Sequence, residues 1–268
     1  MNKVSAKIMG GLGNMLFQIA CAYAYALRNN KKAIFFTKDS VQIHKNILTY
    51  QNNILKNIDL ISNQSNNINT VYNEPNFHFN EIPIINEDVC FNGYFQSEKY
   101  FLDYKKDIKE LFAFSSNQID DIIKKTIDIY SIDIHQNNLC FIHVRRGDYL
   151  NSPNHHPLQN MNYYMKAIKL MPKDSVFLIF SDDIPWCKEN FPDIPEKFKF
   201  IENNTDIEDL LLMTICNNCI ISNSTFSWWG AWLNENKNRI VVAPQKWFGP
   251  AYSHYETKDI YCENWIKI

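Results

Sequence analysis

The 268-residue sequence lacks the excess of basic residues that proteins coating nucleic acid usually carry. Its 27 lysine and arginine residues are balanced by 29 aspartate and glutamate residues, giving a net charge of −2 and a pI near 6.4. Nucleic-acid-binding domains usually show a basic face or a pI above about 9. We therefore expect no nucleic-acid partner. A local basic pocket is still compatible with this balance, and Arg145-Arg146 is its obvious candidate.

The sequence also lacks a paired cysteine framework and a long apolar run. Its seven cysteines are an odd number, and several stand in apolar runs such as Leu139–Ile142, which is typical of reduced, buried thiols. Gly10-Gly11 interrupts the N-terminus, so we expect no signal peptide. No apolar run approaches the ~18 residues of a transmembrane helix. We expect a cytoplasmic protein without a transmembrane segment, with peripheral attachment to the inner membrane left open.

What the sequence does contain is an alternation of apolar strands and amphipathic helices, most regular from residue 139 onward. Almost wholly apolar strands that alternate with helices predict a parallel sheet covered on both faces, and hence the α/β class. A strand at Val4–Met9, a glycine turn and a helix at Met15–Leu27 begin the same pattern near the N-terminus, whereas Lys45–Asn80 is expected to hold loops and short helices. The other expected strands are 33–36, 139–144, 175–181, 198–201, 219–222 and 239–243, and the other expected helices are 162–171, 185–191, 206–217 and 225–234.

Each polar motif stands just after an expected strand, where ligands of parallel sheets bind. The run His143–Tyr149 presents a histidine, two arginines and an aspartate at such a position. Guanidinium forks match phosphate oxygens, and hydrogen bonds to charged groups contribute ~1.5–3 kcal/mol each. The run therefore predicts a diphosphate site. The alternative is a surface ion pair between Arg146 and Asp148.

Glycines at residues 10, 11 and 13 form a turn between a strand and a helix. Backbone N–H groups at a helix N-terminus suit an anion or a closely approaching sugar. The turn is not the dinucleotide fingerprint, because Leu16 stands where its third glycine would fall, and no Gly-Lys-Ser/Thr of a Walker loop follows. A tight turn without a ligand is the alternative.

Two further motifs allow both a binding and a structural interpretation. Asp182-Asp183 could hold Mg²⁺ or Mn²⁺, but Asp183 can equally cap a helix that begins at Ile184-Pro185, which we favour. The stretch Ser222–Thr225 offers hydroxyl and N–H groups for phosphate, or a simple helix cap at Ser224 or Thr225. We expect Trp228-Trp229 to pack in the core rather than to bind sugar.

Taken together, these motifs resemble those of the bacterial α-1,2-fucosyltransferases, glycosyltransferase family 11. The match extends from the first strand to Trp247, and the arginine run combined with Phe226–Trp232 is very specific. The family's glycine motif usually continues Gln-Met-Phe-Gln-Tyr, whereas Met15–Ile19 stands here, so polar roles at positions 15 and 19 are open. The motifs that carry the resemblance are Gly10–Asn14 with Phe17-Gln18, Gly93–Phe101, His143–Tyr149, Phe180–Cys187 and Ser222–Trp232.

The resemblance implies a GT-B-like α/β fold with two Rossmann-type parallel-sheet halves facing across a cleft. We divide the chain into an acceptor-side domain, residues 1–136, and a GDP-fucose-binding domain, residues 137–268, with the stretch 115–138 as the best place for the boundary. The implied reaction is inverting transfer of L-fucose from GDP-fucose to the 2-hydroxyl of a galactose-terminated oligosaccharide. It needs no cofactor and no metal.

The resemblance also implies roles for single residues. Arg145 would bind the β-phosphate, and Asn14 would face the fucose or the attacking hydroxyl. A base must also take the acceptor proton, and Asp148 is our candidate for it, so the predicted catalytic residues are Arg145, Asp148 and Asn14. A metal-dependent transferase of another sugar nucleotide and a non-enzymatic nucleotide- or glycan-binding module are the alternatives. His143 and Asp209 would bind the guanine edge. The full set of expected donor-binding positions is Gly11, Gly13, His143, Arg146, Asp209, Ser222, Asn223, Ser224, Thr225 and Phe226.

Overall fold

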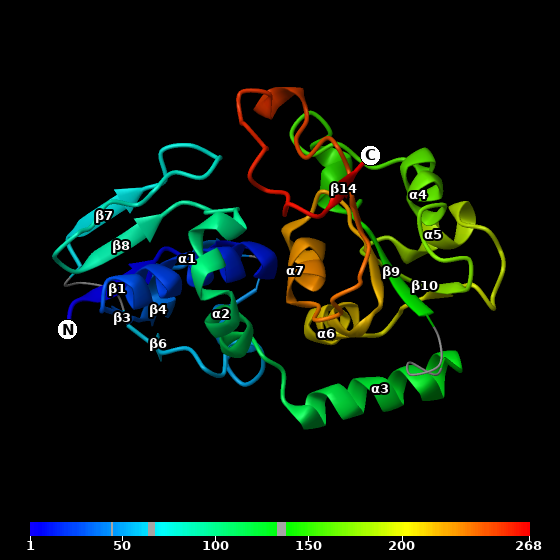
Figure 1. Ribbon diagram of the computed structural model, residues 1–268, viewed down its shortest axis with the longest axis horizontal. Helices are drawn as coiled ribbons and strands as arrows, with labels where there is room; N and C mark the ends of the chain where they lie inside the picture. Colours follow the sequence, from blue (N-terminus) through cyan, green and yellow to red (C-terminus); the bar gives the residue numbers. More distant parts are fainter. Residues whose placement is uncertain (44, 64–67, 133–137) are drawn as a thin grey trace. The chain divides into compact units, whose positions relative to one another are not determined.

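The computed structural model describes residues 1–268 except 44, 64–67 and 133–137, and it forms two compact units (Figure 1). Unit 1 comprises Met1–Phe114 and Tyr255–Cys262, and unit 2 comprises Ser115–His254 and Glu263–Ile268. All strand pairings are parallel among the described residues. The predicted α/β class and the two parallel-sheet units of a GT-B-like fold are confirmed.

The boundary between the units differs from the predicted one. The predicted junction between residues 136 and 137 lies outside the described residues, and the chain leaves unit 1 after Phe114 instead. Helix α3 (Ser116–Tyr130) thus belongs to unit 2. There Lys125 Nζ lies 2.7 Å from Glu208 Oε1, and the side chain of Ile122 is buried. The ion pair joins α3 to α6, a segment far away in the sequence but within the same unit.

Unit 1 is built on a four-stranded sheet of order β3-β1-β8-β7. The expected strand at Val4–Met9 is divided, because β1 ends at Ala6 and β2 pairs separately with β5. The stretch expected to hold loops and short helices also contains the strands β6 and β7. These two strands and β8, which follows later in the chain, were not predicted. The elements of unit 1 are β1 Lys3–Ala6, β2 Met9–Gly10, α1 Leu12–Arg28, β3 Lys32–Ala33, β4 Phe35–Phe36, η1 Thr37–Asp39, β5 Val41–Ile43, η2 Ile47–Tyr50, β6 Leu60–Ile61, β7 Thr70–Asn73, β8 Val89–Asn92, η3 Glu98–Tyr100, η4 Leu102–Tyr104 and α2 Lys105–Leu111.

Unit 2 is built on a six-stranded sheet of order β11-β10-β9-β12-β13-β14. Its two longest strands, β9 and β10, lie side by side over seven residues each. Strand β10 agrees with its predicted bounds, and the other predicted elements from residue 139 onward are present with ends shifted by up to three residues. Besides α3, the elements of unit 2 are β9 Asn138–Val144, η5 Asp148–Asn151, α4 Met161–Ile168, β10 Ser175–Ser181, α5 Ile184–Asn190, β11 Phe198–Phe200, α6 Asp206–Ile215, β12 Asn218–Ile220, α7 Thr225–Leu233, β13 Val241–Ala243, η6 Pro250–Tyr252 and β14 Ile266–Lys267.

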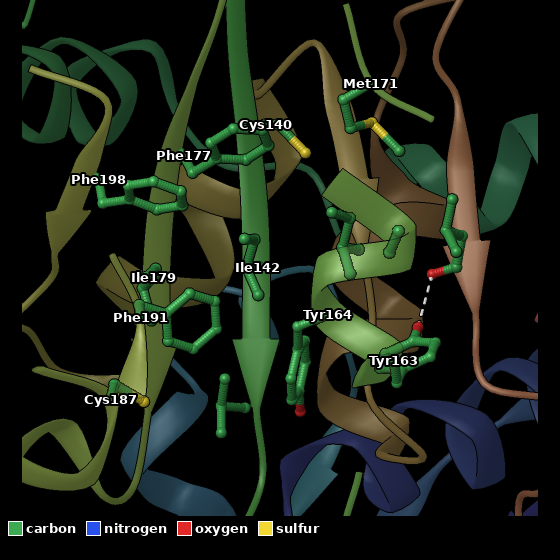
Figure 2. Packing of buried hydrophobic residues seen from close by; sticks show 14 residues of the cluster. Cys140, Ile142, Tyr163, Tyr164, Met171, Phe177, Ile179, Cys187, Phe191 and Phe198 are labelled. Carbon is green, nitrogen blue, oxygen red and sulfur yellow. Dashed lines mark hydrogen bonds between the residues drawn. The ribbon is translucent and has the colours of Figure 1, made fainter. Parts of the chain in front are cut away.

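The core of unit 2 joins α4 and α5 to one face of this sheet (Figure 2). Tyr163 of α4 buries its ring there, and its hydroxyl donates to the carbonyls of Ile221 at 2.5 Å and Val242 at 3.2 Å. These contacts connect α4 to the residue that follows β12 and to β13, and they leave the buried hydroxyl paired. Trp228 and Trp229 of α7 are fully buried, which confirms the prediction that they pack in the core.

A C-terminal segment, Tyr255–Cys262, returns to unit 1. Its Asp259 is buried and accepts from Lys99 Nζ at 2.6 Å and from the backbone N–H of Phe79 at 3.0 Å. The bond to Lys99 helps hold the pKa of Asp259 below its usual range against the effect of burial. In the described part of the chain, no helix is long and apolar enough to span a bilayer.

Candidate active site

The candidate site of unit 2 lies where three adjacent strands end. Strand β9 ends at Val144, which lies opposite Ser181, the last residue of β10, and β12 flanks the other side of β9. Because the strands are parallel, the residues that follow them emerge at one edge of the sheet. The arginine run, the aspartate pair and the Ser222–Phe226 loop therefore meet there.

Arg145 is held at this edge by two carboxylates. Its Nη2 lies 2.6 Å from Asp148 Oδ1, and its Nη1 lies 2.9 Å from Asp182 Oδ2. Its guanidinium carbon lies 5.5 Å from the ring centre of Tyr149. A guanidinium carries five N–H donors, so two ion pairs leave donors for a further anion. With 27% of its side chain exposed, Arg145 is fixed in position and still reachable from solvent.

Arg146 takes part in a separate interaction. Its Nε lies 2.8 Å from Asp183 Oδ2, and its guanidinium stacks at 4.1 Å over the ring of Trp186. Asp183 also accepts from the Trp186 N–H and caps α5, which confirms the predicted cap. The hydrogen bond from Arg146 holds the pKa of Asp183 below its usual range. The alternative pairing of Arg146 with Asp148 is wrong, because Asp148 pairs with Arg145.

Asp182 organises the turn after β9, a role that was not predicted from the sequence. Its Oδ1 accepts from the backbone N–H of Arg146 at 2.9 Å, while its Oδ2 pairs with Arg145. A β-carbon at Gly147 would come within 2.6 Å of the same Oδ2, so the turn approaches Asp182 too closely for a side chain there. Both carboxylates of the pair Asp182-Asp183 are thus engaged by arginines.

His143, near the end of β9, is a buried imidazole. Its Nδ1 is 2.8 Å from Ser222 Oγ, and its ring centre is 5.8 Å from that of Phe226. Burial, reinforced by the positive charge of Arg145, lowers the pKa of His143 to about 3. A neutral imidazole offers one donor and one acceptor. The structure therefore brings together His143, Ser222 and Phe226, three of the predicted donor-binding residues.

The loop that enters α7 is fixed by Asn223. Its side-chain amide donates to the carbonyls of Pro157 and Trp247 and accepts from Gln159, and its own carbonyl accepts from Tyr149. The side chain of Asn223 therefore shapes the loop, and its predicted contact with the donor would fall to the backbone. Ser224 is the N-cap of α7 but, within the described residues, makes no side-chain capping bond.

Asp209, in the first turn of α6, carries an unsatisfied acceptor. Its Oδ1 is buried without a hydrogen-bond partner among the described residues, and a hydrogen bond from Asn204 reaches the carboxyl group. Burial raises the pKa of Asp209 to about 7. An unpaired buried acceptor costs ~1–3 kcal/mol, so a ligand donor at this position would be stabilising.

The glycine turn of unit 1 leads into α1, and Asn14 lies in the first turn of that helix. Gly10 has a φ of +76°, and a β-carbon there would overlap the Asn14 amide. Gly10 is thus the position at which this turn requires glycine. Gly11 and Gly13, which were predicted to bind the donor, follow it as the N-cap and the second residue of α1. Asn14 Oδ1 accepts from Gln96 Nε2 at 3.0 Å. Buried Gln18 forms two hydrogen bonds with the backbone of Met9 and so fixes the start of the turn.

Comparison with known proteins identifies relatives of the whole chain. The family model described as "Glycosyl transferase family 11" matches residues 3–268. The Escherichia coli protein named alpha-1,2-colitosyltransferase is 31% identical, covering 100% of this chain and 99% of its own length. Galactoside alpha-(1,2)-fucosyltransferase 1 of Rattus norvegicus is 35% identical over 101 residues, 34% of this chain and 27% of that protein.

A similar fold occurs in a solved structure, that of NodZ alpha-1,6-fucosyltransferase soaked with GDP-fucose. The TM-score is 0.55 at 16% sequence identity, and the alignment covers 87% of this chain and 92% of that one. At this identity the likeness concerns the fold.

Proposed function

We propose a specific reaction for this chain, which belongs to glycosyltransferase family 11: inverting transfer of L-fucose from GDP-fucose to the 2-hydroxyl of a terminal galactose. The observation that carries the proposal is Arg145, fixed by Asp148 and Asp182 at the end of β9. The names of the relatives support α-1,2 linkage and a galactoside acceptor, and the GDP-fucose with which the NodZ crystal was soaked supports the donor.

The diphosphate is the leaving group, and Arg145 would stabilise it. Negative charge grows on the β-phosphate as the sugar departs, and donors fixed in advance stabilise that charge most effectively. Arg145 is fixed in advance by its two ion pairs. The N-terminus of α7, entered through Ser224, would add backbone N–H groups and the positive end of a helix dipole.

The guanine base would be recognised by Asp209 and His143. The N1–H and N2–H₂ groups of guanine are donors, and the unsatisfied Oδ1 of Asp209 is an acceptor that lacks one. Guanine binding would stabilise the carboxylate form and lower the raised pKa of Asp209. His143 is neutral and can supply one donor or acceptor to the base edge.

The acceptor hydroxyl must lose its proton, and Asp148 is the proposed base. Its side chain is 56% exposed and pairs with Arg145. When the phosphate binds Arg145, that ion pair would weaken, which would free the carboxylate for the proton. Asn14 is proposed to bind the fucose or the attacking hydroxyl.

Two sugars are candidates for the transferred group, fucose and colitose. The E. coli relative is named for colitose, which differs from fucose by the loss of one ring hydroxyl, at C3. A pocket that hydrogen-bonds a hydroxyl rejects the deoxy sugar strongly, whereas an apolar pocket discriminates weakly. The two donors therefore have to be compared directly.

The test offers GDP-fucose and GDP-colitose separately, with lactose or N-acetyllactosamine, with and without EDTA. We expect a 2-linked fucosyl product by NMR, unaffected by EDTA, and at least a ~100-fold loss of turnover in Arg145→Ala. Arg28→Ala, which removes an exposed arginine of unit 1, is the matched control. Near-normal turnover of Arg145→Ala would refute its role. GDP binding by calorimetry without transfer or donor hydrolysis would instead favour a binding module.

A further inference from the structure

Glu74 follows β7 in unit 1 and accepts backbone hydrogen bonds from the loop after β8. Its Oε2 lies 2.7 Å from the N–H of Tyr94, and both of its oxygens lie 3.0 Å from the N–H of Phe95. Its own N–H donates to the Asn92 carbonyl at 2.9 Å. One carboxylate thus fixes two successive peptide groups.

The loop needs this support because its backbone is strained. Phe95 has a φ of +52° and is fully buried, and a bulky residue in the left-handed region costs of order 1–3 kcal/mol. A β-carbon at Gly93 would overlap the side chain of Glu74, so the loop passes directly against it. The strain persists only if surrounding contacts hold the turn, and the Glu74 carboxylate is such a contact.

The residue after the strained position connects the loop to the glycine turn. Gln96 is buried, and its Nε2 donates to Asn14 Oδ1 at 3.0 Å. This bond requires the Asn14 amide to direct its oxygen toward Gln96. The position of Gln96 is in turn set by the conformation of Phe95.

We infer that Glu74 is a positioning residue for sugar transfer, which orients Asn14 through the Phe95 turn and Gln96. The inference rests on the proposed function, because it assigns Asn14 to the sugar or the attacking hydroxyl. Glu74 touches neither substrate in this scheme. Its effect is to keep a polar side chain of the glycine turn in one orientation.

The environment of Glu74 gives the inference a distinctive pH dependence. Burial raises the pKa of Glu74 to about 7, although the two backbone bonds oppose the shift. Cys21, Tyr72 and Tyr100 lie close enough to Glu74 for its negative charge to help raise their own pKa values. The pKa values of all three are raised, so they stay neutral near pH 7. Below about pH 7 Glu74 gains a proton, and its bonds to the loop weaken because they lose the negative charge.

The experiment compares Glu74→Gln with wild type and with Glu81→Gln, an exposed glutamate of the same unit, at saturating GDP-fucose. We expect kcat of Glu74→Gln to fall about 10-fold, because small displacements of a positioning group can cost up to about 100-fold. The Kd for GDP, which we assign to unit 2, should stay within twofold. The acid limb of kcat near pH 7 should disappear in Glu74→Gln and persist in Glu81→Gln. A kcat within twofold of wild type, or an unchanged acid limb, would overturn the inference.

A double-mutant cycle with Gln96→Leu separates positioning from general stability. If Glu74 acts through Gln96, the loss in the double variant should equal that of the larger single variant instead of the product of both. Multiplicative losses would refute the relay. If Glu74→Gln does not fold, an unchanged kcat in Gln96→Leu alone refutes it. Failure of the proposed function differs from all of these, because wild type itself would then transfer no fucose.

Discussion

Replacement of Asp182 tests whether the phosphate-binding role proposed for Arg145 depends on the carboxylate that holds its guanidinium in place. Asp182→Ala removes two contacts, the pair with Arg145 Nη1 and the bond to the Arg146 N–H, both at 2.9 Å. Asp182→Asn keeps an acceptor for the N–H and loses only the charge. The two variants therefore separate the positioning of the turn from the electrostatic contact with Arg145.

The expected loss of kcat follows from how exposed the ion pair between Arg145 and Asp182 is. Bonds to charged groups contribute ~1.5–3 kcal/mol when buried, whereas exposed ion pairs contribute about 0–1 kcal/mol. The side chains of Arg145 and Asp182 are 27% and 26% exposed, so we take about 1–2 kcal/mol for the pair. Since 1.36 kcal/mol is tenfold in rate, kcat should fall about 5–30-fold in Asp182→Ala and less in Asp182→Asn.

The assay measures initial rates with GDP-fucose and lactose, with calorimetry of GDP binding alongside. Asp174→Ala, an exposed aspartate of unit 2, is the matched control and should retain full activity. The double variant Arg145→Ala/Asp182→Ala should be no slower than Arg145→Ala, because Asp182 acts through Arg145. Normal turnover of Asp182→Ala would refute the reasoning, and so would a loss that added Mn²⁺ restores.

Three further outcomes follow. Wild-type turnover should be unchanged by EDTA, because arginines already engage Asp182 and Asp183; loss of activity that Mg²⁺ or Mn²⁺ restores would contradict this. Gln18→Leu should lower the free energy of unfolding in urea by about 2–4 kcal/mol, since both backbone polar groups of Met9 lose a partner, and a loss under 0.5 kcal/mol would argue against the contact. The pKa of His143, about 3 when folded, lies below its usual 6.5, so the unfolded state binds more protons between these values and stability falls as pH drops through that window. His143→Asn should flatten this fall in urea titrations at pH 7 and pH 4.5; an unchanged slope would show that His143 does not cause it.

Periodicity predicted the elements of unit 2 between residues 138 and 243 well because the strands there are largely buried, but it did not predict α3 or β14. Strand β10 is apolar over most of its length, and this pattern bounds it at Ser175 and Ser181. The strands β7 and β8 of unit 1 have four residues each, too few to show a period. They form because β1 and β8 offer neighbours to pair with, which only the tertiary structure supplies.

Residue types predicted the location of the site, whereas strand order determined its pairings. The sequence placed both arginines after one strand and both aspartates after another. It did not reveal that β9 and β10 are neighbours, with Val144 opposite Ser181. That register brings Asp182 to Arg145 and Asp183 to Arg146. A pairing by proximity along the chain, Arg146 with Asp148, was therefore the wrong choice.

The C-terminal segment bears on how such a protein can be recombined. Residues Tyr255–Cys262 belong to unit 1 although Glu263–Ile268 supply β14 to unit 2, so neither unit is encoded by one contiguous stretch of gene. A single crossover near residue 115 would combine residues 1–114 of one protein with the C-terminal segment of another. Lys99 and the Phe79 N–H would then have to bind the residue that the other protein carries in place of Asp259. Exchange of a unit between relatives therefore needs coordinated junctions, and sugar specificity should spread through this lineage by point substitution more readily than by shuffling of halves.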